Sequence, residues 1–466
     1  MSDRRRKTAT RRAAEFVDER VGGARFVREA LGKVFPDHFS FMFGEVALYS
    51  FVVLVVTGVF LTFFFVPSSR TVTYEGSYRP MHGQHVSAAY DSALRLSWDV
   101  RAGLVMRQIH HWAALVFLAA IVLHLARIFF TGAFRRPREI NWIVGVTLLV
   151  LAIGNGFAGY SLLDDLLSGT GLRIMFSVVE SVPVVGDTVA FWVFGGEYPS
   201  DQVIGRLFIA HVLLVPAMIT ALLGIHLALV TRQKHTQFAG PGRTEDNVVG
   251  TRLWPTYAAK SISLFLAVAG SLALLGGLFQ INPIWLYGPY DPAEVTTAAQ
   301  PDWYMGWLEG ALRLMPPWEV RGWGHTVPNV FFPAVLLPGL TFAALYAWPF
   351  LERRFTHDHA EHHLLDRPRD RPVRSALGAA ALTFYLVLFV AGSQDVIAAK
   401  WNISVNHLNW VLRGAAIVLP VVAGFAVHRW CRDLGRGDRQ AAEALDRLAE
   451  AEPHPPVPHE VDTGGP

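Results

Sequence analysis

The sequence is poor in cysteine and in charge: its 466 residues include one cysteine, and charged side chains make up only 17%. Cys431 on its own excludes an intrachain disulfide, and no Cys-x-x-Cys-His motif is present to attach a c-type haem. A single thiol also cannot hold an iron–sulfur cluster. The first apolar run begins late and lacks a small-residue cleavage site, so we expect no cleaved signal peptide.

Apolar sequence is abundant instead, at 52% hydrophobic residues and a mean hydropathy of +0.31. Eight runs are candidate membrane helices, and they predict an all-α integral membrane protein with eight transmembrane helices. The predicted spans are Phe43–Val66, Leu104–Phe130, Trp142–Tyr160, Ile204–Val230, Ser261–Phe279, Val330–Phe350, Ala376–Ala391 and Trp410–Val427.

The basic residues are distributed unevenly around these runs. If the N-terminal tail is cytoplasmic and the helices alternate, most of the 41 Lys and Arg residues fall on the cytoplasmic side. The positive-inside rule therefore predicts that the N- and C-termini are both cytoplasmic. The basic segment Arg4–Lys7 suits anionic membrane lipid better than nucleic acid as a partner.

Two histidine pairs lie in the second and fourth runs. His110 and His124 are 14 residues apart, and His211 and His226 are 15 apart. At about 3.6 residues per turn, each spacing is close to four turns, so each pair shares roughly one helix face. The second and fourth helices run parallel, so the first histidine of one pair faces the first of the other. One imidazole from each side would fill both axial positions of a haem iron and leave electron transfer as its task.

Other interpretations of these histidines stay open. A lone histidine in an apolar helix is usually a hydrogen-bonded packing residue, and histidines that relay protons in a transporter would also lie at membrane depth. Two pairs at nearly equal spacing favour the haem interpretation, in which the first four helices form a dihaem four-helix bundle. His111 fits neither spacing and is assigned to packing or to the membrane interface.

Four glycines repeat the histidine spacing. Gly44 and Gly58 in the first helix are 14 residues apart, as are Gly145 and Gly159 in the third. Glycine lets a backbone or a flat ring approach closely, so these positions could make room for two haem planes. Ordinary packing between membrane helices is the alternative explanation.

Two arginines lie one helical turn from the histidines. Arg107 precedes His110 and Arg127 follows His124. Arginine is suited to bidentate pairing with carboxylates such as the haem propionates. Arg127 would also be explained as a cytoplasmic membrane anchor, whereas Arg107 lies near the less positive side.

Several segments outside the spans have their own character. Residues 159–186 are apolar but broken by Gly and Asp, which predicts short amphipathic helices along the outer surface. Residues 280–320 are rich in Pro and Trp and predict a folded outer loop. The histidines of 352–374 have charged neighbours and no tetrahedral metal spacing, which predicts a solvated face. We divide the chain into a basic cytoplasmic tail (1–35), two membrane parts (36–245 and 246–430) and a disordered cytoplasmic tail (431–466).

These features together resemble the cytochrome b subunit of the quinol:cytochrome c oxidoreductase (bc1) complex over about residues 34–430. The resemblance rests on the paired histidines, the glycines and the Pro-Asp-Trp-Tyr sequence at 301–304. RQIHHWAA (107–114) and FTGAFRRPREINW (130–142) are also similar to cytochrome b6. VFPDHFSFMFGE (34–45), SGTGLRI (168–174) and QPDWYM (300–305) look most like the actinobacterial branch.

The resemblance implies two b-type haems. His110 and His211 would ligate one near the outer face, and His124 and His226 one near the cytoplasm. The extra haem of cytochrome b6 is held by a cysteine at the start of the first helix, and this sequence has none there. Arg107 and Arg127 match arginines near the haem propionates.

The resemblance also implies two quinone pockets. The residues that match the outer, quinol-oxidising pocket are Tyr160, Gly171, Pro301, Asp302, Trp303 and Tyr304. The family's usual glutamate is replaced by Asp302, whose reach is one methylene shorter, so proton transfer from quinol would need a bridging water. At the inner pocket Thr231 stands where mitochondrial members have histidine, which leaves Arg232, Lys234 and His235 as candidates.

The function implied is that of a respiratory quinol:cytochrome c reductase subunit in a bacterial cell membrane. Quinol would be oxidised at the outer face of the membrane, and the resemblance to the actinobacterial branch indicates menaquinol. One electron would cross through the two haems to reduce quinone inside, contributing to the proton gradient. The implied partners are a Rieske iron–sulfur subunit, a dihaem c-type cytochrome, a terminal cytochrome oxidase and a second copy of the chain. A dihaem anchor of a soluble dehydrogenase is the nearest rival, and it would need neither the 301–304 motif nor the last three helices.

Overall fold

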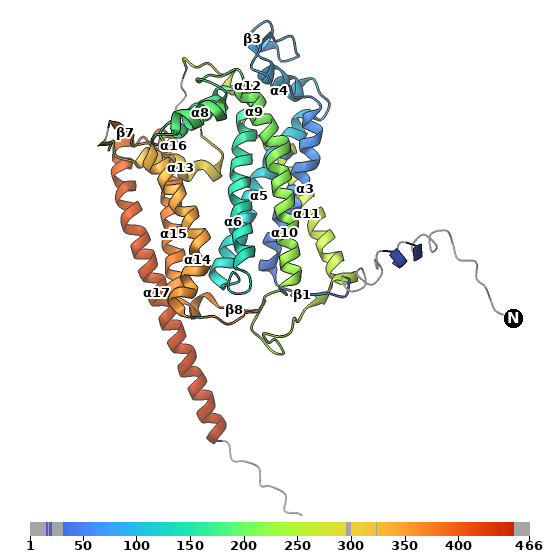
Figure 1. The fold of residues 1–466 in the computed structure, drawn as a ribbon, viewed down its shortest axis with the longest axis vertical. Coiled ribbons are helices and arrows are strands. Elements are labelled where there is room, and N and C mark those ends of the chain that lie inside the picture. Colours follow the sequence, from blue (N-terminus) through green and yellow to red (C-terminus); the bar gives the residue numbers. More distant parts are fainter. Residues whose placement is uncertain (1–14, 17, 21–30, 295–299, 323, 452–466) are drawn as a thin grey trace, which may run out of the picture.

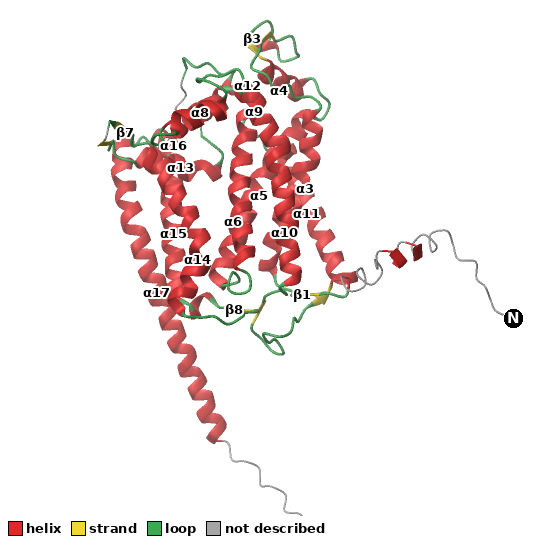
Figure 2. Ribbon diagram, in the orientation of Figure 1, coloured by secondary structure: helices red, strands yellow, loops and turns green. Residues whose placement is uncertain are grey.

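A computed structural model describes residues 15–16, 18–20, 31–294, 300–322 and 324–451. Within these residues, long helices make up most of the structure, and strands occur only as short pairs in the loops (Figures 1 and 2). The chain is therefore an all-helical bundle whose connecting segments are folded rather than extended.

Eight helices in the described residues are long and apolar enough to cross a membrane, which confirms the eight predicted spans. They are Phe39–Thr62 (with α3, Met42–Thr62), Gly103–Thr131 (α5), Glu139–Leu163 (with α6, Glu139–Tyr160), Val203–Arg232 (α9, Val203–Ile209; η4, Ala210–Leu214; α10, Val215–Arg232), Leu253–Leu278 (η5, Leu253–Tyr257; α11, Ala258–Leu278), Phe332–Thr356 (with α14, Leu337–Thr356), Pro372–Gly392 (α15) and Val405–Asp438 (within α17, Val405–Ala451).

Apolar side chains cover the outside of these helices. No more than a third of the most apolar window of any span is buried inside the molecule. Leu266 on α11 and Ile417 on α17, for example, are 62% and 73% exposed. Such surfaces are stable in lipid and not in water, so the chain is a multi-pass membrane protein.

The helices form two neighbouring groups. Helix α5 packs against α3, α6 and α11, and α10 packs against α6. In the second group α15 packs against α17 and against α13 (Trp303–Leu314), while α14 contacts α6 and so joins the groups (Figure 1). Because α5 and α10 both follow an odd number of crossings, they run parallel, as the histidine pairing requires.

The two ends of the bundle differ in how they are covered. We call them the His110 end and the His124 end after the histidines of α5 nearest to them. The elements at the His110 end are α4 (Ala88–Trp98), α7 (Leu166–Glu180), α8 (Gly186–Phe194), α12 (Ile284–Tyr287), α13, α16 (Gln394–Trp401) and the hairpins β2–β3 (Thr71–Thr73, His85–Ser87) and β6–β7 (Val320–Gly322, His325–Val327). The His124 end has β1–β5 (Val34–Phe35, Thr251–Arg252) and β4–β8 (Gln237–Phe238, Leu364–Leu365).

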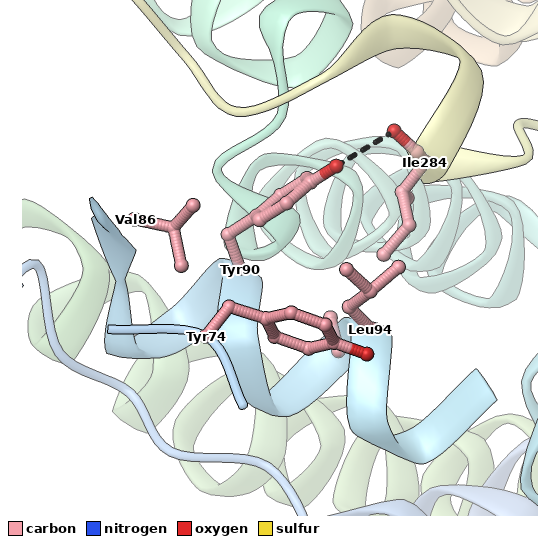
Figure 3. Packing of buried hydrophobic residues seen from close by; sticks show 6 residues of the cluster. Tyr74, Val86, Tyr90, Leu94 and Ile284 are labelled. Atoms are coloured by element: carbon pink, nitrogen blue, oxygen red, sulfur yellow. Dashed lines mark hydrogen bonds between the residues drawn. The ribbon is translucent and has the colours of Figure 1, made fainter. Parts of the chain in front are cut away.

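A hydrophobic cluster fixes part of the cover at the His110 end (Figure 3). Tyr74, Tyr90 and Leu94 are fully buried against Ile284 of α12. The Tyr90 hydroxyl donates to the carbonyl oxygen of Ile284 at 3.3 Å, so its polar tip is satisfied inside the cluster. The segment after α3 is thereby joined to the segment after α11, close to the start of α5.

The structure corrects the predicted C-terminal tail. Residues 431–451 were expected to be disordered, but α17 continues through them to Ala451, well past the end of the bundle (Figure 1). Ala, Leu, Glu and Arg, which are frequent in this segment, are strong helix formers. Residues 452–466, and most of the predicted tail 1–35, lie outside the described residues.

Candidate functional site

The four predicted histidines meet in two pairs inside the first helical group. The ring centroids of His110 and His211 are 6.1 Å apart, and those of His124 and His226 are 6.3 Å apart. Two imidazole–metal bonds of about 2 Å, plus roughly 1.2 Å from each nitrogen to its ring centre, require about 6.4 Å. The gap in each pair therefore fits one metal ion held from both sides.

Hydrogen bonds orient the pair at the His110 end. Nδ1 of His110 lies 2.9 Å from Thr57 Oγ1, whose own hydroxyl donates to Val53 O at 2.6 Å. Thr57 must then accept from His110, so Nδ1 carries the hydrogen and Nε2 keeps its lone pair. Nδ1 of His211 lies 2.9 Å from the carbonyl oxygen of Asn155 and is likewise the protonated nitrogen. Such bonds fix the tautomer that a metal needs.

A π-helical turn explains why the second spacing is one residue longer. The fourth span is regular except at η4, where Val215 N–H donates to Ala210 O across an extra residue. At about 100° per residue, 14 residues end about 40° short of four turns and 15 end about 60° beyond. A π-turn absorbs one residue, so His211 and His226 recover the phase of His110 and His124.

Each of the four predicted glycines backs onto one histidine. A Cβ at Gly44 or Gly58 would lie 3.2 Å from Cε1 of His124 or His110, one at Gly145 would lie 3.7 Å from Cε1 of His226, and one at Gly159 only 2.4 Å from Cε1 of His211. Helices α3 and α6 therefore contact the edges of the histidine rings through glycines, with no side chain between them. The predicted reason, space for a flat ring, remains a proposal.

A cavity of about 310 Å³ surrounds the pair at the His124 end. Arg127 lines it, with its guanidinium 4.8 Å from the ring centre of Phe41, and its Nε and Nη1 are buried with no hydrogen-bond partner among the described residues. At the other pair Arg107 is buried, reaches Asn282 O at 3.4 Å through both terminal nitrogens and leaves Nε unpartnered. Unpartnered guanidinium nitrogens fit a ligand that brings carboxylates.

The predicted outer-pocket residues are brought together from α6, α7 and the start of α13. A cavity of about 90 Å³ is lined by Tyr160, Gly171, Pro301, Asp302 and Tyr304. The Tyr304 hydroxyl donates to Asp302 Oδ2 at 3.3 Å, and burial together with this carboxylate holds the pKa of Tyr304 well above its usual value. Trp303 does not line the cavity, because its ring packs with a neighbouring apolar cluster.

His111, which was assigned to packing or to the membrane interface, contacts one of the residues that line this cavity. Its Nε2 lies 2.8 Å from Asp302 Oδ1, and both side chains are largely buried. Asp302 stands at the N-cap of α13 but makes no capping hydrogen bond with its side chain. The carboxylate is thus held by His111 and Tyr304 and exposed to the positive end of the helix dipole.

Two further pocket residues escaped the sequence argument. Glu309, one and a half turns into α13, lines the cavity with a buried Oε2 that has no partner in the described residues, while its other oxygen meets Arg313. Burial raises the pKa of Glu309 despite Arg313. Gly156 makes room for Tyr304, because a Cβ there would lie 2.6 Å from the tyrosine hydroxyl. The pattern Asn-Gly-Phe-Ala-Gly was the available signal for Gly156.

The candidates at the His124 end divide into two groups. Lys234 and His235 line the 310 Å³ cavity, whereas Thr231 and Arg232 are exposed and do not. Burial first, and then Lys33 and Arg138, lower the pKa of His235 to about 4. Nε2 of His235 is buried without a partner in the described part of the chain.

The histidines of 352–374 are only partly as predicted. His357 and His359 are exposed, but His363 is 7% exposed and its Nδ1 lies 2.7 Å from Arg138. The solvated-face prediction is wrong for His363 because β8 docks this segment onto β4. Across the described ranges, no cluster of three His, Cys, Asp or Glu side chains could hold a metal ion.

Comparisons with known proteins place this arrangement in a class. A family profile described as "Cytochrome b(N-terminal)/b6/petB" matches residues 115–289. A solved chain titled "Hyperthermophilic respiratory Complex III" shares the fold, with a TM-score of 0.65 and 22% identity over 90% of this chain and 100% of that one. Over residues 115–289 the chain therefore matches a family that implies b-type haem, and the solved chain shows that the fold is shared.

Sequence relatives narrow the class to a family. Proteins named "Cytochrome bc1 complex cytochrome b subunit" are 55% identical in Mycobacterium tuberculosis (93% of this chain, 79% of the relative) and 51% identical in Streptomyces coelicolor (92% and 79%). The chain belongs to the cytochrome b subunits of the bc1 complex, the respiratory quinol:cytochrome c oxidoreductase. It is accordingly an enzyme subunit of a multi-subunit complex in the bacterial cell membrane.

Proposed function

We propose that the chain passes electrons between two quinone sites at opposite ends of the bundle, through one haem at each histidine pair. The observation that carries this proposal is the pair of facing imidazoles, 6.1 and 6.3 Å apart, on parallel helices. At about 1.5 Å rise per residue the two pairs are separated by about 21 Å along the axis. Each bound haem would supply one reversible electron carrier.

The residues of the chain have separate tasks in this proposal. His110, His211, His124 and His226 would hold the two haem irons, and Gly44, Gly58, Gly145 and Gly159 leave the histidine edges free of side chains. Arg107 and Arg127 bind propionate carboxylates with their unpartnered guanidinium nitrogens. Held by two histidines, each haem would supply electron transfer rather than oxygen binding.

The pocket at the His110 end oxidises quinol. Tyr160 and Tyr304 border the headgroup, Gly171 keeps the Tyr160 ring accessible (its Cβ would lie 3.2 Å from Cε1), and Asp302 accepts a proton from the quinol hydroxyl. The His111 contact and the helix dipole hold the Asp302 carboxylate in place before proton transfer. Pro301 forms part of the cavity wall. Trp303 lies outside the cavity and packs in the apolar cluster that contains Tyr304.

The sidedness and partners follow from charge and family. The His124 end, which carries the greater share of Lys and Arg, is cytoplasmic, so both termini are cytoplasmic. One electron from each quinol goes to a Rieske iron–sulfur subunit, because this chain cannot hold a cluster, and then to a dihaem c-type cytochrome. Menaquinol is the donor, the chain works as a homodimer, and a terminal cytochrome oxidase completes the assembly.

The test is a rapid-mixing experiment on the purified complex with a menaquinol analogue, followed by b-haem absorbance. We expect both b haems to become reduced, at a rate lowered about 10²-fold by Asp302→Asn, since a positioned base contributes about this much. Trp112→Phe, whose ring nitrogen donates to Phe279 O and which does not line the pocket, should keep the wild-type rate. Failure of quinol to reduce either b haem in the intact complex would contradict the proposal.

A further inference from the structure

A carboxylate at the His124 end has more hydrogen-bond donors than helix packing requires. Glu45 lies in the first turn of α3. Its Oε2 accepts from the Tyr49 hydroxyl at 3.1 Å and from Ser261 Oγ at 3.0 Å. The Tyr257 hydroxyl donates to Oε1, and Tyr49 and Ser261 also contact each other. Three hydroxyls from α3, η5 and α11 therefore converge on one side chain that the sequence did not single out.

The same carboxylate forms part of a cavity wall. Glu45 and Tyr257 line the 310 Å³ cavity, together with Lys234 and His235, and this cavity extends to His124 and His226. The Phe35 ring contacts both His235 and Tyr257, with centroid distances of 4.4 Å in each case. Aromatic rings therefore adjoin polar groups at the cavity, a lining that suits a planar ring bearing carbonyl oxygens.

Resting on the proposed function, we propose that Glu45, held by Tyr49, Tyr257 and Ser261, donates the protons to the quinone that is reduced at the His124 end. The buried, unpartnered Nε2 of His235 gives a second polar contact for the same headgroup. Lys234 and His235 belong to the segment already suspected from the sequence, whereas the Glu45 cluster adds the acid that the reaction needs.

The proton balance follows from the chemistry of quinone reduction. Each quinone takes up two electrons, which enter past His124 and His226, and two protons. The Glu45 O–H bond breaks as an O–H bond forms on a quinone oxygen, and the carboxylate is then protonated again by water at the His124 end. The three hydroxyl donors stabilise the carboxylate between transfers, so one residue supplies both protons in turn.

Titratable and charged groups surround Glu45 from several neighbouring elements. The groups concerned are Tyr49 on its own helix, Tyr257 and the Lys260–Asp37 ion pair beside α11, Arg127 on α5, and Lys234 and His235 after α10. Positive charges outnumber the one facing carboxylate, Asp37. The Glu45 carboxylate therefore stands among several cationic groups of the cavity wall.

The test uses the whole complex with its b haems reduced in advance. 2,3-Dimethyl-1,4-naphthoquinone is added, and haem reoxidation is followed from pH 5.5 to about 9 at saturating quinone. We expect Glu45→Gln to slow reoxidation about 10²-fold and to remove its pH dependence, and Glu45→Asp to restore part of the rate. Quinone affinity, measured by fluorescence quenching of the oxidised complex, should change less than about threefold, since binding itself needs no proton.

Matched controls separate a proton donor from a structural tie. Glu139→Gln removes a carboxylate at the same end, paired with Arg353 and outside the cavity, and should leave the rate and pH profile unchanged. Tyr257→Phe keeps Glu45 but removes one hydrogen-bond donor to its carboxylate. Haem reoxidation should therefore slow about tenfold, the cost of losing one charge-assisted hydrogen bond. This variant decides the question if Glu45→Gln does not assemble.

The outcomes for the two proposals are distinct. A wild-type rate and pH profile in Glu45→Gln, or a wild-type rate in Tyr257→Phe, would overturn the role of Glu45 and leave the electron path standing. Wild-type complex whose reduced b haems are not reoxidised by the naphthoquinone would instead overturn the proposed function.

Discussion

At the scale of single residues, the contact between His111 and Asp302 connects α5 with the start of α13. Asp302 is one methylene shorter than the family's usual glutamate, and the 2.8 Å contact with His111 fixes where its carboxylate stands. Because Tyr304 holds the other oxygen, the side chain is oriented before any quinol arrives. Orientation of this kind lowers the barrier by removing the search for the reactive geometry.

We therefore expect His111→Asn to lower the kcat of quinol oxidation about tenfold with little change in KM, the cost of losing one charge-assisted hydrogen bond. Haem content should stay at the wild-type level, because His110 keeps its ligand geometry. Trp112→Phe is the control, since Trp112 is next in sequence but donates to Phe279 O, away from the pocket. Wild-type kcat in His111→Asn would show that the contact is incidental.

The glycines give a graded test of the fit around the histidines. Gly159→Ala should abolish binding of the haem at His110 and His211, because the new Cβ would lie 2.4 Å from His211 Cε1. Gly145→Ala should keep both haems, because 3.7 Å to His226 is an ordinary contact. Haem content and the reduced-minus-oxidised spectrum measure both variants. Equal haem loss in the two would mean that distance to the histidine does not govern binding.

Buried neutral His235 should make the folded protein sensitive to acid. Burial, followed by Lys33 and Arg138, lowers its folded pKa to about 4, whereas the unfolded value is about 6.5. Its contribution to stability is therefore complete above about pH 6.5 and is lost as the pH falls toward 4. His235→Asn should show a smaller drop in thermal midpoint between pH 7.5 and about 4.5 than wild type. Parallel pH curves for the two proteins would rule out this contribution.

At the scale of helices, the π-turn η4 corrects the phase of the fourth span. The sequence showed that the two spacings differ by one residue, but not where the extra residue would be absorbed. The structure places it within Ala210–Leu214, beside His211, and leaves the rest of the span regular. A π-turn at a ligand position is a common association in proteins.

One-residue deletions test this reading of the two helices. Removing Leu213, which is 60% exposed, should convert η4 to regular helix and keep both haems. Removing Val116 from α5, which has no extra residue, should rotate His110 against His124 by about 100° and lose at least one haem. Haem per polypeptide measures both deletions. Loss of haem from the Leu213 deletion alone would show that the shape of the turn matters, rather than its residue count.

Patterns local in the sequence predicted more than contacts between distant segments did. The apolar runs gave all eight spans, and the spacing gave the histidine pairs, because both depend on helical periodicity. The His111–Asp302 and Glu45–Tyr257 contacts join residues 191 and 212 positions apart, and no periodicity reports such a contact. The disorder predicted for residues 431–451 was wrong because these residues favour helix and continue α17 to Ala451. Their charged composition had suggested disorder instead.

At the scale of the whole molecule, the proposed electron path has a cavity near each end. The 90 Å³ cavity at the His110 end is lined by residues of α7 and α13. The 310 Å³ cavity at the His124 end is lined by residues of β1 and of the segment after α10. His124 and His226 line the larger cavity, and Tyr160 of the smaller one follows Gly159, which backs onto His211. In the proposed function the quinol, the two haems and the quinone therefore follow one another across the membrane. A proton relay or a single-haem anchor would not require this order.

The most direct measurement is the number of b-type haems per polypeptide in the purified complex, from a dithionite-reduced minus oxidised spectrum and pyridine haemochrome analysis. We expect two b haems in wild type and one each in His110→Ala and His124→Ala, with different bands remaining in the two variants. No b haem, or one, in a folded wild-type chain produced with haem available would contradict the paired-histidine electron path.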